Sequence, residues 1–348
     1  MVRFQAAAAG RARAWTWATV VLTGGAMAAA IALAPPSSAT PDSALTWLLF
    51  TGSSAHVAST GWFYTSAPVR AHMRQHLARY LWVPLGLVAG AGALAAGLSR
   101  PALEWLLLAY FGWQFFHYQK QNLGLAALAA ASHRAASLTR GERRALVAAG
   151  LAGIGGLLAH PGLLQLSVAP VLARGFPLAL LAFAAATGAG LWLLARRPRA
   201  DRPAGLCAVY ASALVFWLPV FVFGSPYAAV AGLTIAHGLQ YLLLVGLVAD
   251  GGRRGTGRVL PLAALGNIAL IGGALLSAAS HLHSAPPAGR VLYGGYLGVV
   301  MAHFVIDGGL WRMRDSFPRS FLAARVPYLL PGGRPEGSAP VPSAGDIR

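Results

Sequence analysis

Long apolar runs take up most of this chain, and they constrain its fold more than any other feature of the sequence. A helix needs about 20 apolar residues to cross the hydrocarbon core of a bilayer. Runs of that kind occur ten times, at roughly 15–34, 44–64, 81–99, 102–122, 145–165, 176–195, 204–223, 227–249, 259–280 and 290–311. The sequence therefore predicts an all-α polytopic membrane protein with about ten transmembrane helices.

Composition supports the same class. Hydrophobic residues make up 57% of the chain and charged residues only 10%, whereas about a quarter of the residues in a soluble domain are charged. The formal net charge of +18 lies in short loops. Such a distribution is typical of the positive-inside rule and of attraction to anionic lipids at the cytoplasmic face, so no nucleic-acid partner is expected.

The loops between the runs alternate between arginine-rich and arginine-poor. The arginine-rich set includes residues 69–80, 132–144 and 195–202, and it belongs on the cytoplasmic side. This assignment puts both termini in the cytoplasm. The excess of arginine and alanine is typical of a GC-rich bacterial genome, so we expect a multi-pass protein of the bacterial inner membrane.

The domain organisation follows from these runs. The first run could be a signal peptide cleaved near 37–44, but it is longer than a usual signal core, which favours an uncleaved anchor. A single cysteine, Cys207, excludes an internal disulfide. We expect four parts: a cytoplasmic N-terminal segment at 1–14, a transmembrane helical domain at 15–311, an interfacial segment at 312–330 and a disordered tail at 331–348.

Four of the runs each carry a histidine at a similar depth. Counted from the outer ends of the runs, these histidines fall roughly 11 to 16 residues in, a spread in depth of about 6–8 Å. The last run also carries a carboxylate four residues after its histidine, on the same helical face. Ionisable groups at this depth are costly unless they share a site. We predict one metal site with the ligands His56, His117, His237, His303 and Asp307, in which Asp307 is a ligand or a catalytic base.

Polar residues follow three of these histidines at helical spacing. Thr60 lies four residues after His56, and Gln121 lies four after His117; Gln240 and Tyr241 lie three and four after His237. Ligating histidines usually bond a polar partner through their second ring nitrogen, which makes these residues candidate supports for the ligands. The same pattern would also suit a purely structural polar seam between helices.

The remaining ionisable groups near the runs have simpler interpretations. Lys120 is predicted to reach towards the cytoplasmic interface. His72 and His76 lie on one face of a basic inner loop, either as interfacial residues or as further ligands. His160 and the pair at 281 and 283 fall in outer loops, where solvated side chains are expected.

The residue types in the predicted site favour redox metal chemistry. Neutral imidazole is a common ligand of iron, copper and zinc, and a neighbouring carboxylate favours iron. Non-haem iron is therefore expected, with copper or zinc as possibilities. Two alternatives stay open: histidine pairs that clamp haem b for electron transfer, and a proton- or metal-coupled transporter that uses the histidines and Asp307 as a relay.

The layout of single histidines on several spans, without a soluble domain, resembles the Brp/Blh type of bacterial membrane carotenoid oxygenases. This resemblance implies iron held by intramembrane histidines. From the residues we predict a membrane-embedded metal-dependent oxidoreductase of the non-haem iron oxygenase, hydroxylase or desaturase type. Its substrate would be apolar or lipid-like, and an acidic cytoplasmic electron donor could approach the arginine-rich loops.

Overall fold

The structure is a computed structural model that describes residues 2–36, 40–168, 170–251 and 255–330. Every regular element in these ranges is helical. The α-helices are α1 (Val2–Ala32), α2 (Ser43–Phe50), α3 (His56–Ser59), α4 (Ala67–Arg74), α5 (Val83–Gly97), α6 (Arg100–Ser132), α7 (Arg140–Ala159), α8 (Phe176–Arg196), α9 (Ala204–Val215), α10 (Leu218–Val222), α11 (Gly232–Asp250), α12 (Val259–Asn267), α13 (Gly273–Ser280), α14 (Pro287–Leu310) and α15 (Ser316–Arg325).

Short π- and 3-10-helical turns join several of these helices into longer rods. The π-helical turns are η1 (Thr51–Ala55), η3 (Ala78–Trp82), η7 (Tyr227–Ala231) and η9 (Ile268–Gly272). The 3-10 turns are η2 (Thr60–Thr65), η4 (Pro161–Leu164), η5 (Pro170–Gly175), η6 (Arg199–Asp201), η8 (Gly255–Arg258) and η10 (His281–Ser284). Each π-helical turn inserts one extra residue and so re-aims the side chains that follow it.

The predicted all-α class is confirmed, and seven helices in the described ranges are long and apolar enough to cross a membrane. They are Ala6–Ala32, Ala78–Gly97, Val171–Arg196, Ala204–Val222, Tyr227–Asp250, Val259–Ser284 and Pro287–Leu310. Each corresponds to one of the predicted runs. The other three runs are also helical but are shorter or more polar: 44–64 becomes α2, η1, α3 and η2, while 102–122 and 145–165 fall in α6 and α7.

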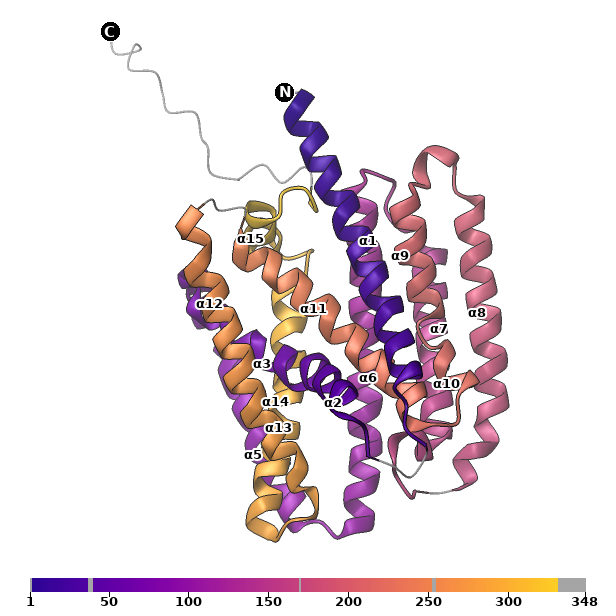
Figure 1. The fold of residues 1–348 in the computed structure, drawn as a ribbon, viewed down its shortest axis with the longest axis vertical. Coiled ribbons are helices and arrows are strands. Elements are labelled where there is room, and N and C mark those ends of the chain that lie inside the picture. The colour runs from indigo at the N-terminus through magenta and orange to yellow at the C-terminus, as the bar shows by residue number, and fades with distance from the viewer. Residues whose placement is uncertain (1, 37–39, 169, 252–254, 331–348) are drawn as a thin grey trace.

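The helices lie side by side in a bundle. α5 packs along α14, α7 packs along α8, and α1 packs against both α9 and α11. Figure 1 shows α7 to α10 on one side and α5, α12, α13 and α14 on the other, with α1, α6 and α11 between them. α11 is the most enclosed candidate span: 72% of its apolar window is buried, against 11% for the span at 171–196.

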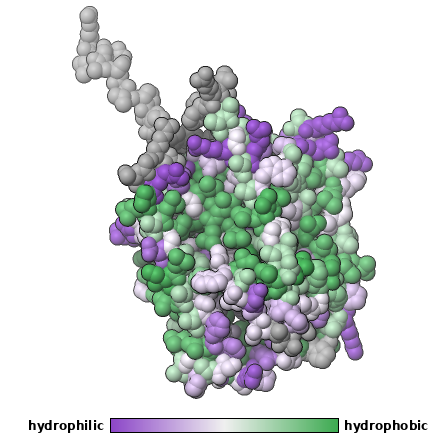
Figure 2. Space-filling model, in the orientation of Figure 1, coloured by the Kyte–Doolittle hydropathy of each residue, from purple (hydrophilic) through white to green (hydrophobic). Residues whose placement is uncertain are grey.

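The surface carries the polarity expected of a membrane protein. Large apolar side chains such as Trp105, Leu181 and Leu275 are exposed at 50% or more. In Figure 2, apolar residues cover the middle of the visible face, while hydrophilic residues gather towards its ends. Bilayer lipid would cover such an apolar surface at no cost in free energy.

A buried ion pair fixes the arginine-rich end of α7 and α8. Thr139 caps α7 in a capping box with Glu142. Arg197, just after α8, donates two hydrogen bonds to the same carboxylate, from Nε to Oε1 at 2.5 Å and from Nη2 to Oε2 at 3.0 Å. Arg197 also donates to the carbonyls of Ala136 and Ser137, so one guanidinium closes the loop between α6 and α7.

The described end of the chain forms one more helix after α14. α15 lies within the predicted interfacial segment, at the same end of the bundle as the first turns of α1 (Figure 1). The predicted disordered tail at 331–348 lies outside the described residues, as do residues 37–39 of the alternative cleavage region.

Candidate metal centre

Glycine contacts between helix backbones bring two of the predicted histidines together. Gly52 lies in η1, one turn before His56, and Gly238 directly follows His237 in α11. A Cβ atom on Gly238 would lie 2.3 Å from the carbonyl oxygen of Gly52, and one on Gly52 would lie 2.5 Å from the Cα atom of Ile235. The two helices therefore touch backbone to backbone, at a separation that only glycine allows.

The structure brings all four predicted histidines into one cluster. Their ring centroids form a closed cycle: His56 is 5.0 Å from His237 and 5.1 Å from His303, and His117 is 5.1 Å from both of those rings. Ring nitrogens about 2 Å from one ion would put the ring centroids roughly 5 Å apart. The spacing of the rings thus allows neighbouring rings to share an ion.

The nitrogens of these rings are buried without partners. Six ring nitrogens have no partner in good hydrogen-bond geometry: both of His56, both of His237, and Nε2 of His117 and of His303, with the backbone of Gly52 and Ser53 near the His56 ring. Side-chain exposure is 2% or less for His56, His237 and His303, while His117 is partly exposed. Buried polar atoms in folded proteins nearly always have a partner, so a cluster of this kind calls for one that binds several nitrogens at once.

Two overlapping groups of atoms have the proximity that a metal ion requires. One joins His56, His237 and His303, and the other joins His117, His303 and Asp307. In each group, one ligand atom per residue lies within 4.8 Å of the others. His303 belongs to both groups.

A chain of hydrogen bonds holds His303 in one orientation. Its Nδ1 lies 2.6 Å from Oγ1 of Thr60, that oxygen lies 2.8 Å from the hydroxyl of Tyr241, and Tyr241 donates to Oδ1 of Asp307 at 2.9 Å. Since the Tyr241 proton goes to the carboxylate, Thr60 donates to Tyr241 and must accept from His303. Nδ1 of His303 then carries the proton, and its Nε2 has a free lone pair.

The polar neighbours support the cluster differently from the prediction. Thr60 bonds His303 rather than His56, and Tyr241 bonds Thr60 and Asp307 rather than His237. Gln121 donates to the carbonyl oxygen of His237 and to Gln240, whose amide donates to Thr23. Helical spacing placed these side chains at the right depth, but their partners lie across helix interfaces.

Aromatic rings close the cluster on its sides. Tyr118 stacks on His237 with ring centroids 3.9 Å apart, and Phe304 stacks on His117 at 4.5 Å. The sequence analysis missed Phe304, while the sequence allows Tyr118 to be either an interface residue or a pocket wall. Their positions give a signal, because each directly follows a site histidine in the chain.

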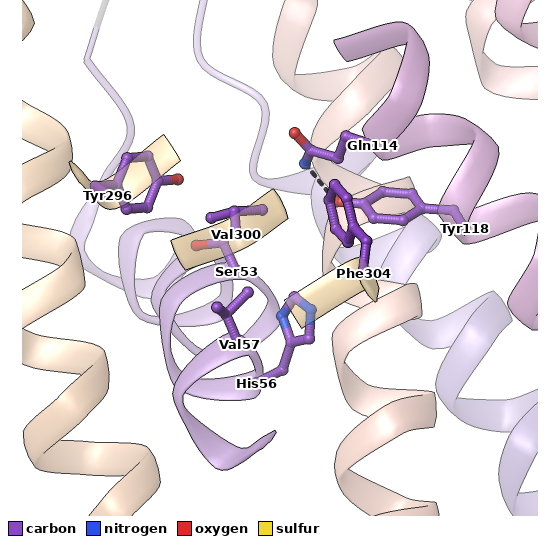
Figure 3. Close-up of a pocket in the computed structure, with 8 residues that line it drawn as sticks. All are labelled: Ser53, His56, Val57, Gln114, Tyr118, Tyr296, Val300 and Phe304. Carbon is purple, nitrogen blue, oxygen red and sulfur yellow. Dashed lines mark hydrogen bonds between the residues drawn. The ribbon is translucent and has the colours of Figure 1, made fainter. Parts of the chain in front are cut away.

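A small pocket adjoins His56, on the side towards the N-terminal ends of the helices that carry the site histidines. Figure 3 shows His56, Val57 and Ser53 on one helix, with Val300 and Phe304 on α14 opposite them. Gln114, Tyr118 and Tyr296 complete the lining, and Gln114 donates to the Tyr118 hydroxyl. The pocket has a volume of about 10 Å³, which is room for roughly one water-sized molecule.

Comparison with protein-family models, curated proteins and solved structures found no match to the chain. The geometry of the site itself therefore carries the functional argument.

The other histidines lie outside the cluster. The rings of His72 and His76 are tilted by 40° to each other with centroids 4.4 Å apart, and His72 stacks on Phe317 at 4.1 Å, which ties α4 to α15. Burial is the main cause that lowers the pKa of His72. His160 and His281 are exposed at the opposite ends of their helices from the arginine-rich loops.

Proposed function

We propose that this chain is a membrane-embedded, metal-dependent oxidoreductase of the non-haem iron oxygenase, hydroxylase or desaturase type. One observation carries the proposal: six ring nitrogens of four histidines are buried together without hydrogen-bond partners. Leaving each unpaired costs about 1–3 kcal/mol, and a shared metal ion would satisfy several of them. A bound iron ion would supply dioxygen-activating and redox chemistry.

The ligands we propose are His56, His117, His237 and His303. Asp307 acts on His303: its Oδ2 lies 3.6 Å from Nδ1 of that ring, and through Tyr241 and Thr60 it fixes the proton on Nδ1 and leaves Nε2 free. Such partners typically change metal affinity 10- to 100-fold. Copper and zinc also accept imidazole ligands, so the identity of the metal rests on analysis of the purified protein.

The small pocket limits what could reach the cluster from that side. With room for roughly one water-sized molecule, the pocket beside His56 is too small for a long apolar molecule. An apolar or lipid-like substrate would therefore meet the centre from another side. Haem is less well supported, because a macrocycle between two ligands needs a flat slot, while these four rings pack edge to face against one another.

We also propose the finer topology. The runs at 44–64, 102–122 and 145–165 would cross the membrane together with the seven apolar helices, and both termini would lie in the cytoplasm. α6 is long enough to span a bilayer, and its polar residues Gln119 and Asn122 are buried inside the bundle rather than facing lipid. The protein would then lie in a bacterial inner membrane, and its arginine-rich loops would attract anionic lipids and an acidic electron donor.

Metal analysis of the purified full-length protein tests the function. Metal content and the optical spectrum would be measured for the wild type, His237→Ala, His303→Ala and the exposed control His281→Ala. We expect non-haem metal in the wild type and in the control, and loss of it in the two site variants. A Soret band would move the assignment to haem, and equal metal content in all four proteins would refute the proposed ligands.

A further inference from the structure

One face of α6 leads from the surface of the molecule to the proposed metal centre. Trp113, Phe116, Lys120 and Gly124 are exposed along it, at the three- and four-residue spacing that puts side chains on one side of a helix. His117 lies on the edge of this face. It is the partly exposed member of the four-histidine cluster, and its buried Nε2 points inward without a partner. We call these residues the α6 face.

The α6 face is mostly aromatic apart from one cation. Trp113 and Phe116 are each 39% exposed. The buried Phe304 of α14 packs against both Trp113, at 5.8 Å, and His117, at 4.5 Å, and so joins the exposed Trp113 ring to the histidine cluster. A long apolar chain could lie on these rings within contact of the His117 ring.

Lys120 marks one end of the face. Its ammonium lies 5.9 Å from the Phe116 ring centroid, and no carboxylate among the described residues forms an ion pair with it. Along the helix axis it lies only about 4.5 Å beyond His117, towards the arginine-rich end. An ammonium at the edge of an apolar face attracts an anionic head group whose tail follows the aromatic rings.

From this juxtaposition we propose that the α6 face binds a single-chain amphiphile with a carboxylate head, that is, a long-chain fatty acid, with the carboxylate at Lys120 and the chain along Phe116 and Trp113. One cation matches the single charge of a carboxylate, and a face one helix wide matches a single chain. The proposal rests on the proposed oxidoreductase function, because it names the substrate class for that centre.

Photo-crosslinking tests this binding without requiring metal or turnover. The full-length protein is reconstituted in phosphatidylcholine nanodiscs with a diazirine-labelled palmitate, and the labelled peptides are mapped by mass spectrometry. We expect label on α6 around Trp113 and Phe116. Unlabelled palmitate should compete for this labelling, and hexadecanol should compete at least tenfold more weakly.

Variants separate a specific site from ordinary lipid contact. Lys120→Met should weaken labelling of α6 about tenfold or more, while Lys120→Arg should keep it. Arg196→Met is the matched control, because Arg196 also lies over an exposed aromatic ring, that of Trp192 at 4.7 Å, on a helix that does not contact the cluster. That variant should label like the wild type.

Three results would overturn the proposal: equal competition by hexadecanol, unchanged labelling of Lys120→Met, or label spread evenly over the lipid-facing helices. The same preparations are assayed for metal, so the two proposals can fail separately. Fatty-acid binding at Lys120 in a protein without metal would refute the oxidoreductase and leave the binding site. Metal without such binding would refute only the substrate class.

Discussion

The backbone contact between Gly238 and Gly52 yields a sharp prediction about the metal centre. Replacing Gly238 with alanine puts a Cβ atom 2.3 Å from the carbonyl oxygen and 2.5 Å from the Cα atom of Gly52, whereas ordinary contact begins at 3.4 Å. Both atoms belong to backbone, so no rotation of a side chain relieves the clash. The helices that carry His237 and His56 must therefore move apart by about 1 Å.

A movement of that size matters for coordination. Metal–nitrogen bonds are about 2.0–2.1 Å long and tolerate deviations of only about 0.2 Å. Overpacking of this kind costs about 1–3 kcal/mol, and if that strain falls on the metal-bound state, retention of the metal weakens roughly 5- to 150-fold. We expect Gly238→Ala to lose metal to a chelator at correspondingly lower chelator concentration.

Gly246 in the same helix provides the matched control, because a Cβ atom there meets nothing within 4 Å. Gly246→Ala should keep its metal and unfold at the same or a higher temperature, since alanine favours a helix by about 1 kcal/mol over glycine. Metal content after chelator titration is measured by mass spectrometry for both variants and the wild type. Equal retention by Gly238→Ala and Gly246→Ala would show that helix separation does not set the geometry of the centre.

Three further outcomes are expected. Thr60→Val breaks the bond that orients His303 and should weaken metal binding about 10- to 100-fold in the same chelator titration, whereas Thr65→Val, whose hydroxyl bonds only its own helix, should not. Glu142→Gln removes the charge that Arg197 grips and should lower the free energy of unfolding by about 1.5–3 kcal/mol, seen as a lower melting temperature with unchanged metal content. Burial raises the pKa of Glu142, but the hydrogen bonds from Arg197 and Thr139 outweigh it and hold the pKa below the usual 4.5. The ion pair therefore stabilises the fold fully above pH 4.5 and loses this effect as the pH falls through the lowered pKa of Glu142. The difference in melting temperature between the wild type and Glu142→Gln should shrink on acidification.

The sequence was sufficient to predict the helices. Hydropathy depends only on the local run of residues, so it located each of the seven candidate spans in the described residues. The convergence of the four histidines could also be predicted, because ionisable groups at one depth in lipid are costly in free energy unless they face one another. These histidines are His56, His117, His237 and His303.

The sequence could not predict which side chains meet across helix interfaces. The i+4 rule gives the face on which Thr60 or Tyr241 lies, but the rotation of each helix decides which neighbour that face meets. Nor could the chain's 42 glycines be ranked. Gly52 and Gly238 matter because another backbone lies against them, and Gly246 does not, although all three look alike in sequence. The π-helical turn η1 before His56 has no sequence signal that we can identify.

The energetics of the cluster connect its fold to its proposed chemistry. Six buried nitrogens without partners, at about 1–3 kcal/mol each, cost an amount of the same order as the margin of about 5–15 kcal/mol by which a typical domain is stable. The surrounding bundle must hold the rings together against that cost, and it does so with close glycine contacts and a hydrogen-bond chain that ends on Asp307. A fold that needed only helix–helix packing could have used leucine at these positions without this cost in free energy. The arrangement makes physical sense when the binding of a ligand common to the four rings offsets that cost.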